Sequence, residues 1–147
     1  MKSKQVIVIR TDLRNTNGQK IRTGKIISQC CHASMKVILD MMNSVPNMKY
    51  INSDGDIGED VKHLNIEGGS ALNDWINGIF TKVCVSVDSE NELISIYESA
   101  KSMGIPCSMI EDVGLTEFGG VVTKTSVAVG PGWSEDIDKI TGHLKLL

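Results

Sequence analysis

The sequence predicts a single α/β domain over residues 1–147, in which α-helices cover a four-stranded mixed β-sheet. Short β-branched runs alternate along the chain with segments of helical periodicity, which is the pattern of an α/β fold. A length of 147 residues allows one sizeable hydrophobic core. With 41% hydrophobic and 22% charged residues, the composition is that of an ordinary globular protein. The predicted order is β-α-(excursion)-β-α-β-β-α, and the excursion covers about residues 43–80.

The N-terminal third contains the first strand and the first helix. Lys4 to Arg10 is a β-branched run with a continuous apolar centre, which predicts a buried strand. Polar turn residues follow between Arg14 and Lys20. A helix is predicted from about Gly24 to Met42, with Thr23 as its N-cap, because apolar residues recur there at spacings of three and four.

After this helix comes a segment rich in Gly, Asn and acidic residues. Alternate Asn and Asp residues over 52–56 imitate the start of a calcium-binding loop. However, Gly58 stands one place too late for the sharp turn of an EF-hand, and His63 replaces the closing Glu. We therefore reject a calcium site and interpret residues 43–80 as an excursion that decorates the domain, with a short helix from Ser70 to Asn77.

The C-terminal half alternates strands and helices in the same way. Its predicted strands are Thr81 to Val87, Cys107 to Ile110 and Thr123 to Val129. Ser89 and Glu92 form a capping box at the start of an amphipathic helix. The run Gly130-Pro131-Gly132 is expected to break the chain before a last short helix, which Ser134 caps and which ends near Gly142.

Charge is distributed unevenly along the chain. Residues 1–50 contain nine Lys or Arg and two Asp, whereas residues 51–147 contain six Lys and sixteen Asp or Glu. A basic N-terminal third on an acidic protein predicts a local anion-binding surface, for nucleic acid or for phosphate-bearing small molecules. Because the chain shows neither a long apolar run nor a charged leader before an apolar segment, we expect a cytoplasmic protein without a membrane span. Four cysteines without CxxC spacing are expected to be reduced core thiols: Cys30, Cys31, Cys84 and Cys107.

One face of the first predicted helix is polar. At about 100° per residue, an arc of roughly 80° contains Lys25, Gln29, His32 and Lys36. Together with the partial positive charge of a helix N-terminus, Lys25 suits a phosphate or a developing oxyanion, and a solvated polar face is the alternative. Asp12, the only acid among the first 39 residues, is expected either to pair with Lys25 or to hold a turn.

The neighbouring Cys31 and His32 raise the possibility of a hydrolase with a cysteine–histidine nucleophile. Adjacent helical residues point about 100° apart, so these two side chains face different surfaces. The sequence therefore argues against such a dyad, and we expect Cys30 and Cys31 to be dispensable for chemistry.

Five segments along the chain match one known family in order. They are Arg10-Thr11-Asp12-Leu13, Gly24-Lys25-Ile26 with Gln29 and His32-Ala33-Ser34, Glu111 to Thr116, Gly130-Pro131, and Thr141 to Leu147. In these segments the chain resembles the peptidyl-tRNA hydrolases of the archaeal and eukaryotic type. The resemblance covers nearly the whole chain apart from the excursion between Met42 and Thr81.

This resemblance implies hydrolysis of the ester that joins a peptide to the 3′ ribose of tRNA, which recycles tRNA from aborted translation. It also implies that no metal or organic cofactor takes part, and that the protein forms a homodimer. Position by position, the family's site falls on Lys25, Gln29, Asp112 and Thr116, with His32 and Asp12 close by. The alternative is a non-catalytic tRNA-binding or interaction module with the same fold, although such a module would not need the Asp112 carboxylate.

Ester hydrolysis needs an oriented water, a group that takes up its proton, and donors for the tetrahedral oxyanion. Asp112 would orient or deprotonate the water, and Thr116 would relay the proton or position the water. Lys25 and the helix N-terminus would stabilise the oxyanion or hold the 3′-terminal phosphates, and Gln29 would donate to either group. The general base is left open. Phosphate contacts are expected from Lys20, Arg22, Lys25 and Lys36.

Overall fold

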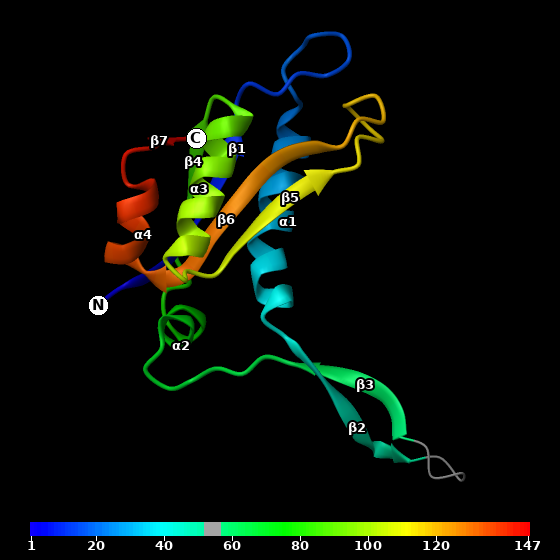
Figure 1. Ribbon diagram of the computed structural model, residues 1–147, viewed down its shortest axis with the longest axis vertical. Helices are drawn as coiled ribbons and strands as arrows, with labels where there is room; N and C mark the ends of the chain where they lie inside the picture. Colours follow the sequence, from blue (N-terminus) through cyan, green and yellow to red (C-terminus); the bar gives the residue numbers. More distant parts are fainter. Residues whose placement is uncertain (52–56) are drawn as a thin grey trace.

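The computed structural model describes residues 1–51 and 57–147, and it describes side chains outside residues 47–59. Along this part of the chain the elements are β1 (Ser3–Arg10), α1 (Thr23–Asp40), β2 (Asn43–Ile51), β3 (Ile57–His63), α2 (Ala71–Asn77), β4 (Lys82–Val87), α3 (Glu90–Ser102), β5 (Cys107–Asp112), β6 (Thr123–Trp133), α4 (Ser134–Thr141) and β7 (Lys145–Leu146) (Figure 1). The α/β class and the mixed sheet are confirmed.

The main sheet has five strands, in the order β5-β6-β1-β4-β7, so the predicted number of four is wrong. The added strand is β7, in which Lys145 pairs with Ser86 of β4. Two residues carry no periodicity, which is why the tail did not indicate a strand. β1 is parallel to β4 and antiparallel to β6, and β6 is antiparallel to β5. The carboxyl ends of β1, β4 and β5 therefore lie at the same edge of the sheet.

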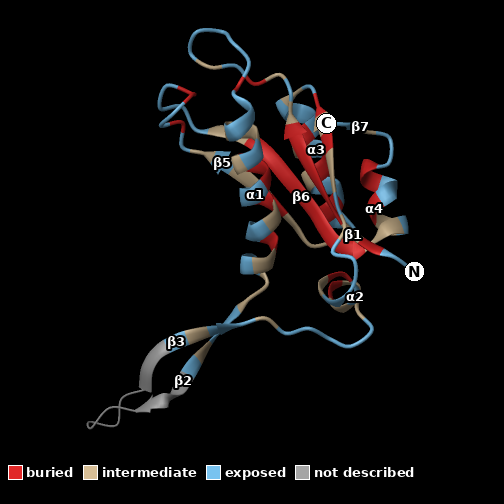
Figure 2. Cartoon of the chain, turned by 180° about the vertical axis from the view of Figure 1, so that it is seen from behind, coloured by how far each residue is buried: buried red, intermediate tan, exposed pale blue. Residues whose placement is uncertain are grey.

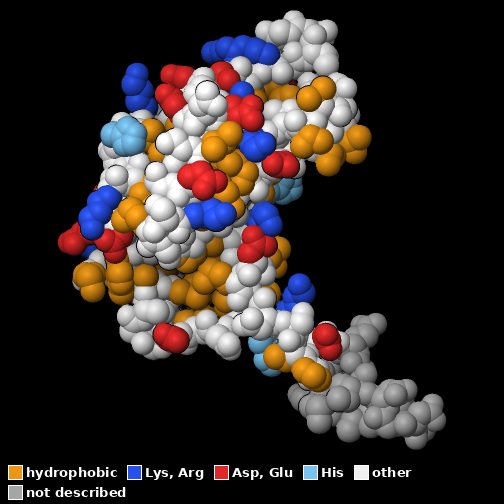
Figure 3. Space-filling view, in the orientation of Figure 1, with side chains coloured by type: hydrophobic (Ala, Val, Ile, Leu, Met, Phe, Trp, Pro, Cys, Tyr) orange, Lys and Arg blue, Asp and Glu red, His pale blue; other side chains and the backbone are white. Residues whose placement is uncertain are grey.

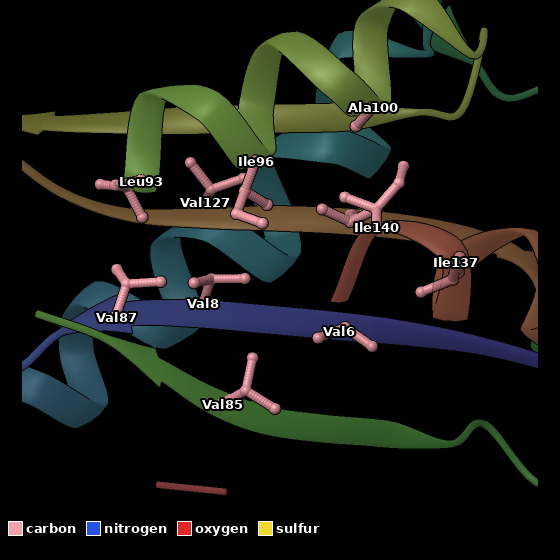
Figure 4. Packing of buried hydrophobic residues seen from close by; sticks show 11 residues of the cluster. Val6, Val8, Val85, Val87, Leu93, Ile96, Ala100, Val127, Ile137 and Ile140 are labelled. Carbon is pink, nitrogen blue, oxygen red and sulfur yellow. The ribbon is translucent and has the colours of Figure 1, made fainter. Parts of the chain in front are cut away.

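Helices cover both faces of this sheet, and β1 and β6 are buried between them (Figure 2). On one face, α3 and α4 pack on valines of the central strands (Figure 4). On the other face, α1 packs on β1 and β6 through Cys30, Ala33 and Val37. The predicted buried strand is confirmed, since Val8 of β1 is 0% exposed. Each such buried Val or Ile contributes about 1.5–3 kcal/mol to stability.

β6 is longer than predicted, because the Gly130-Pro131-Gly132 run lies within the strand. The pairing with β1 shifts register between Lys4 and Val6 and then resumes with Gly132 and Trp133. Gly130 has φ +93°, and a Cβ there would lie 2.6 Å from the Lys4 carbonyl oxygen. A glycine at this bulge is therefore what allows the strand to continue.

The helix starts agree with the prediction at one of three places. Ser89 caps α3 through a 3.1 Å hydrogen bond that its hydroxyl accepts from the Glu92 N–H. Thr23 and Ser134 are instead the first residues of their helices, and the N-cap positions belong to Arg22 and Trp133, without a side-chain cap bond. At α1, the Arg22 side chain is bound to Glu117 and its backbone is not helical, so Arg22 is the N-cap and the helix begins at Thr23, one residue earlier than predicted.

The excursion contains the short helix predicted around Trp75, in which the Ser70 hydroxyl accepts from the Asn73 N–H. Its first half is the β2–β3 hairpin, which projects away from the sheet (Figure 1). Strands were not predicted here, because Asn, Gly and Pro interrupt the alternation. The calcium-loop pattern over 52–56 lies outside the described residues.

The cysteines are all free thiols, but they are not all core residues. Cys30 is buried, as predicted, whereas Cys31 is exposed and Cys84 and Cys107 are half-buried. Cys31 was expected in the core because it lies inside a helix. The adjacent Cys30 already faces the sheet, and a rotation of about 100° turns the next side chain outward.

Candidate active site

All the predicted site residues except His32 and Lys36 lie near the edge of the sheet where β1, β4 and β5 end. The loop of residues 11–22 leaves β1 there, α1 starts there, and the loop of residues 113–122 leaves β5 (Figure 1). The two loops therefore face each other at one end of the molecule. This arrangement agrees with the expectation that ligands of α/β proteins bind beyond the carboxyl ends of parallel strands.

Lys25, in the first turn of α1, connects the helix to the end of β5. Its Nζ lies 2.7 Å from Asp112 Oδ2 and 3.0 Å from Thr116 Oγ1. The side chains of Lys25 and Asp112 are 14% and 13% exposed, so this ion pair is largely shielded from water. Charge-assisted hydrogen bonds of this kind are about twice as strong as neutral ones.

Asp112 is held by two further donors. Gln29 Nε2 donates to Oδ2 at 3.0 Å, and the Gly114 N–H donates to Oδ1 at 2.8 Å. Burial alone would raise the pKa of the Asp112 carboxyl, but the hydrogen bonds from Lys25, Gly114 and Gln29 outweigh it and hold the pKa below its ordinary value. Asp112 is therefore an anion throughout the neutral range.

Gln29 is a buried residue, although its helix face was predicted to be polar. It is 2% exposed, and its Oε1 accepts a 2.6 Å hydrogen bond from Thr125 Oγ1. Its backbone carbonyl accepts from the Ser126 hydroxyl at 2.9 Å. Both ends of the Gln29 amide are thus engaged, and Thr125 fixes which end faces Asp112. Thr125 was not predicted from the sequence as a site residue. The one sequence feature that could have indicated it is the pair of hydroxyl residues, Thr125 and Ser126, inside a predicted strand.

The loop of residues 113–122 is folded back on itself beside Asp112. The Gly120 N–H donates to the Gly114 carbonyl at 2.8 Å. Gly114 has φ +81°, and a Cβ there would lie 2.4 Å from the Val121 carbonyl oxygen, so only glycine fits. Phe118 of this loop is buried, and Lys25 Nζ lies 5.7 Å from the centre of its ring. Apolar side chains gather over the outside of this loop (Figure 3).

Of the two roles expected for Asp12, the pairing with Lys25 is wrong. Its carboxylate accepts two hydrogen bonds from Arg10, at 2.9 Å from Nε and 2.7 Å from Nη2. The hydrogen bonds from Arg10 hold the pKa of Asp12 below its ordinary value, against the effect of burial. Asp12 is thus paired with the Arg10 guanidinium, two residues away. Lys25 is paired with Asp112, which is distant in the sequence.

His32 and Lys36 lie on the same helix face, farther along α1. His32 comes seven positions after Lys25, which is about 10 Å along the helix axis. The exposed His32 ring lies 3.3 Å from Ser28 Oγ, and Lys36 Nζ lies 3.0 Å from Asp40. The polar face is therefore buried against the sheet around Gln29 and open to solvent from His32 onward.

The remaining predicted cations lie near the start of α1. Lys20 is exposed in the first loop. Arg22 is 78% exposed, and its Nε donates at 2.6 Å to Glu117, whose side chain is 5% exposed. Within the described part of the chain, the other oxygen of Glu117 is a buried polar atom without a hydrogen-bond partner.

The described part of the chain holds neither a grouped set of metal ligands nor a membrane-spanning helix. In residues 1–46 and 60–147, whose side chains the structure describes, no three His, Cys, Asp or Glu side chains are grouped as a metal ion would require. None of the helices in these two ranges is long and apolar enough to cross a membrane. What the site does hold is a shielded ammonium, a fixed carboxylate and a hydroxyl, which together can orient water and stabilise an oxyanion.

Comparisons with known proteins identify the family of this chain. The family model for "Peptidyl-tRNA hydrolase PTH2" matches residues 3–147. The chain is 39% identical over 144 residues to a peptidyl-tRNA hydrolase of Methanocaldococcus jannaschii, which covers 98% of this chain and 99% of that protein. It is 34% identical over 147 residues to one of Sulfurisphaera tokodaii, which covers 100% of both chains. A solved Agrobacterium tumefaciens structure of unknown function is similar in fold alone, with a TM-score of 0.52 at 12% identity, over 100% of this chain and 98% of that one. The chain therefore belongs to the PTH2 family of peptidyl-tRNA hydrolases.

Proposed function

We propose that Lys25, Asp112 and Thr116 form the centre at which this enzyme hydrolyses the ester between the peptide and the 3′ ribose of tRNA. The observation that supports this most directly is the position of Lys25 Nζ, 2.7 Å from Asp112 and 3.0 Å from Thr116. An ammonium, a carboxylate and a hydroxyl within one hydrogen-bonded group can serve an attacking water and a developing oxyanion at once.

In the proposed reaction, the oxygen of a water molecule attacks the ester carbonyl carbon. The carbonyl oxygen becomes an oxyanion, which Lys25 stabilises as a charged donor. The proton that the attacking water loses passes through the Thr116 hydroxyl to the ribose 3′-oxygen, which leaves as the tetrahedral intermediate collapses. Asp112 Oδ1 accepts one hydrogen bond from the Gly114 N–H and retains a lone pair for the water. Thr116 fixes the other side of the water.

The low pKa of Asp112 distinguishes between its two expected roles. A general base works best when its pKa lies near the operating pH, whereas this carboxylate is held below its ordinary value. Asp112 therefore orients the water and holds Lys25, rather than carrying the proton away. Gln29, which is buried behind Asp112, acts as a positioning residue. His32 belongs to the surrounding surface and does not touch the reacting atoms.

The phosphates of the tRNA are bound by cations around this centre. Lys20 and Arg22 are exposed next to the start of α1, and they form the inner part of this surface. Lys36, near the end of the helix and close to Asp40, is its outermost member. Because peptidyl-tRNA is a product of translation, we locate the enzyme in the cytoplasm.

The test of the proposed function uses a labelled N-blocked aminoacyl-tRNA as substrate. Wild-type protein should release the N-blocked amino acid and leave intact tRNA, and Lys25→Ala should abolish most of this release. Binding of the tRNA without cleavage of the ester would support the non-catalytic module instead.

We also infer a homodimer that uses the outer face of α1. Ile27, Met35 and Leu39 on this face are 57%, 58% and 47% exposed. Ile27 and Met35 line an apolar groove of about 470 Å³ between α1 and β4, whose walls include Phe80 and Leu147. Exposed apolar surface of this kind is typical of interfaces. Sedimentation should show a dimer for the wild type and a monomer for Met35→Lys, and a monomeric wild type would contradict this inference.

A further inference from the structure

A second cavity lies beside the Lys25–Asp112 centre, between the two loops at the same edge of the sheet. It has a volume of about 320 Å³. One wall comes from residues 10–16 and includes Arg14, and the other comes from residues 118–123 and includes Phe118, Val121 and Thr123. We call this cavity the loop cleft.

The loop cleft adjoins the Lys25–Asp112 centre, because two of its lining residues contact or pair with residues of the centre. Phe118 lines the cleft, and its ring is also the one that Lys25 Nζ approaches at 5.7 Å. Thr123, on the same wall, is paired with Asp112 across β5 and β6. Phe118 and the Asp112–Thr123 strand pair therefore lie between the loop cleft and the Lys25–Asp112 centre.

The two walls differ in chemistry. The first wall carries the guanidinium of Arg14 and the carboxylate of Asp12, which accepts from Arg10 and retains lone pairs for a further donor. The second wall is largely apolar, with the ring of Phe118 and the exposed side chain of Val121. A cation and an acceptor opposite an aromatic and an aliphatic surface are suited to a nucleotide, whose base stacks and whose phosphate is anionic.

The walls are also fixed before a ligand arrives. Arg14 Nη1 donates to the carbonyls of Thr11 and Leu13, and Asn15 Oδ1 accepts two backbone N–H groups of its own loop. At one end the loops meet, since a Cβ on Gly119 would lie 2.9 Å from the Thr16 methyl group. Preorganised walls lower the entropy that is lost on binding.

We propose that the loop cleft binds the 3′-terminal nucleotide of the tRNA, with its base against Phe118 and Val121 and its phosphate on Arg14. This inference rests on the proposed function, because the ribose of the terminal nucleotide carries the ester and its base must lie next to the centre. A volume of about 320 Å³ is enough for one nucleotide and too small for two. The neighbouring cavity, lined by Lys20 and Ile26, measures about 190 Å³ and has no aromatic wall.

The experiment measures nucleotide binding apart from hydrolysis. Adenosine 5′-monophosphate, the probe, is titrated into 15N-labelled wild-type protein, and the amide signals of residues 10–16 and 118–123 should shift. Arg14→Ala removes the phosphate partner, and Val121→Trp fills the cleft from an exposed position. Each should weaken binding by on the order of tenfold. Lys101→Ala, which removes an exposed cation on α3, is the matched control and should bind like the wild type.

Hydrolysis of the N-blocked aminoacyl-tRNA provides the second measurement. Arg14→Ala should raise KM by on the order of tenfold and change kcat little, because the phosphate contact exists before and during the reaction. The loop cleft is the wrong site if the probe shifts signals elsewhere, or if both variants bind the probe like the wild type while wild-type enzyme cleaves the ester. If the wild type binds the probe in the cleft but leaves the ester intact, the proposed function fails and the nucleotide site stands.

Discussion

Replacement of Asp112 by Asn tests the proposed centre most directly, because it keeps the shape of the side chain and removes its charge. In the wild type, Oδ2 accepts from Lys25 Nζ and Gln29 Nε2, and Oδ1 accepts from the Gly114 N–H. An Asn amide has one oxygen, so in either orientation at least one of these donors faces an NH2 group. Lys25 also loses its anionic partner.

The expected loss of turnover is roughly 10²–10³-fold, the span observed when one preorganised group that stabilises the transition state is removed. Binding of tRNA should stay the same or become tighter, because a negative charge disappears and the Lys25 ammonium is released from it. Lys25→Ala should behave differently. It removes a group that can contact both the ground-state phosphates and the oxyanion, so turnover should fall and KM should rise.

The assay combines single-turnover hydrolysis with filter binding for both variants, at a temperature where both are folded. Loss of a hydrogen bond to a charged group should lower the free energy of unfolding of Asp112→Asn by about 1–3 kcal/mol, which denaturant titration measures. Glu111→Gln is the matched control, since it removes an exposed carboxylate one residue away. If Asp112→Asn hydrolyses normally, or if weaker tRNA binding explains its whole defect, Asp112 is only a turn residue.

The pH dependence follows from the same hydrogen bonds. The pKa of Asp112 is lower in the folded chain than the ordinary value of about 3.9, so the folded state favours the ionised form. Its contribution to stability is complete above pH 4 and is lost as the pH falls through the folded-state pKa. The difference in unfolding free energy between wild type and Asp112→Asn should therefore be constant from about pH 7 to pH 5 and shrink below about pH 4. A difference that already shrinks between pH 7 and pH 5 would contradict this account.

Four further predictions concern the rest of the chain. Hydrolysis should continue in EDTA when the folding of the tRNA itself is controlled, and loss of activity that a divalent ion restores to the protein would refute this. Burial raises the pKa of Cys30 to about 12, so iodoacetamide at pH 8 should label Cys31 and spare Cys30; Cys31→Ala should keep more than a tenth of normal turnover. Arg22→Ala leaves the buried Glu117 carboxylate without its donor and should lower the free energy of unfolding by about 1–3 kcal/mol, whereas the same change in a Glu117→Gln background should cost less. Lys36→Ala should flatten the log–log dependence of tRNA affinity on salt by about 0.7–0.9, and an unchanged slope would restrict the phosphate-binding surface to the start of α1.

Local sequence patterns were sufficient to predict the elements whose structure depends on residues close by in the sequence. β1 is a β-branched run that must be buried on both faces, and the Ser89–Glu92 pair caps α3 through bonds within one turn. The predictions failed where the structure of a segment depends on contact with a strand that is distant in the sequence. β7 exists because β4 offers an open edge, and β6 continues past its glycines because Lys4 lies opposite. Nothing within either segment encodes those partners.

The candidate site shows the same division between local and distant information. Helical spacing placed Lys25 and Gln29 on one face, but it could not identify the acid that pairs with Lys25. Asp12 was the nearer acid in the sequence, yet Arg10 lies two residues from it in the same segment and binds both of its oxygens. Asp112 was indicated only by the family resemblance, because 86 residues of chain lie between it and Lys25.

The pairing within the centre also explains why binding and chemistry require different cations. Lys25 and Asp112 together carry no net charge, and their 2.7 Å contact is largely shielded from water, so this pair attracts a polyanion weakly. Attraction of the tRNA must come from cations outside the pair, such as Arg14, Lys20 and Arg22 in the loop before α1. The hydroxyl of Thr125 fixes Gln29, Gln29 fixes Asp112, and Asp112 fixes Lys25, which keeps the ammonium in place until an oxyanion forms beside it. Substitutions in the loop should therefore act on KM, and substitutions of Thr125, Gln29 and Asp112 should act on kcat.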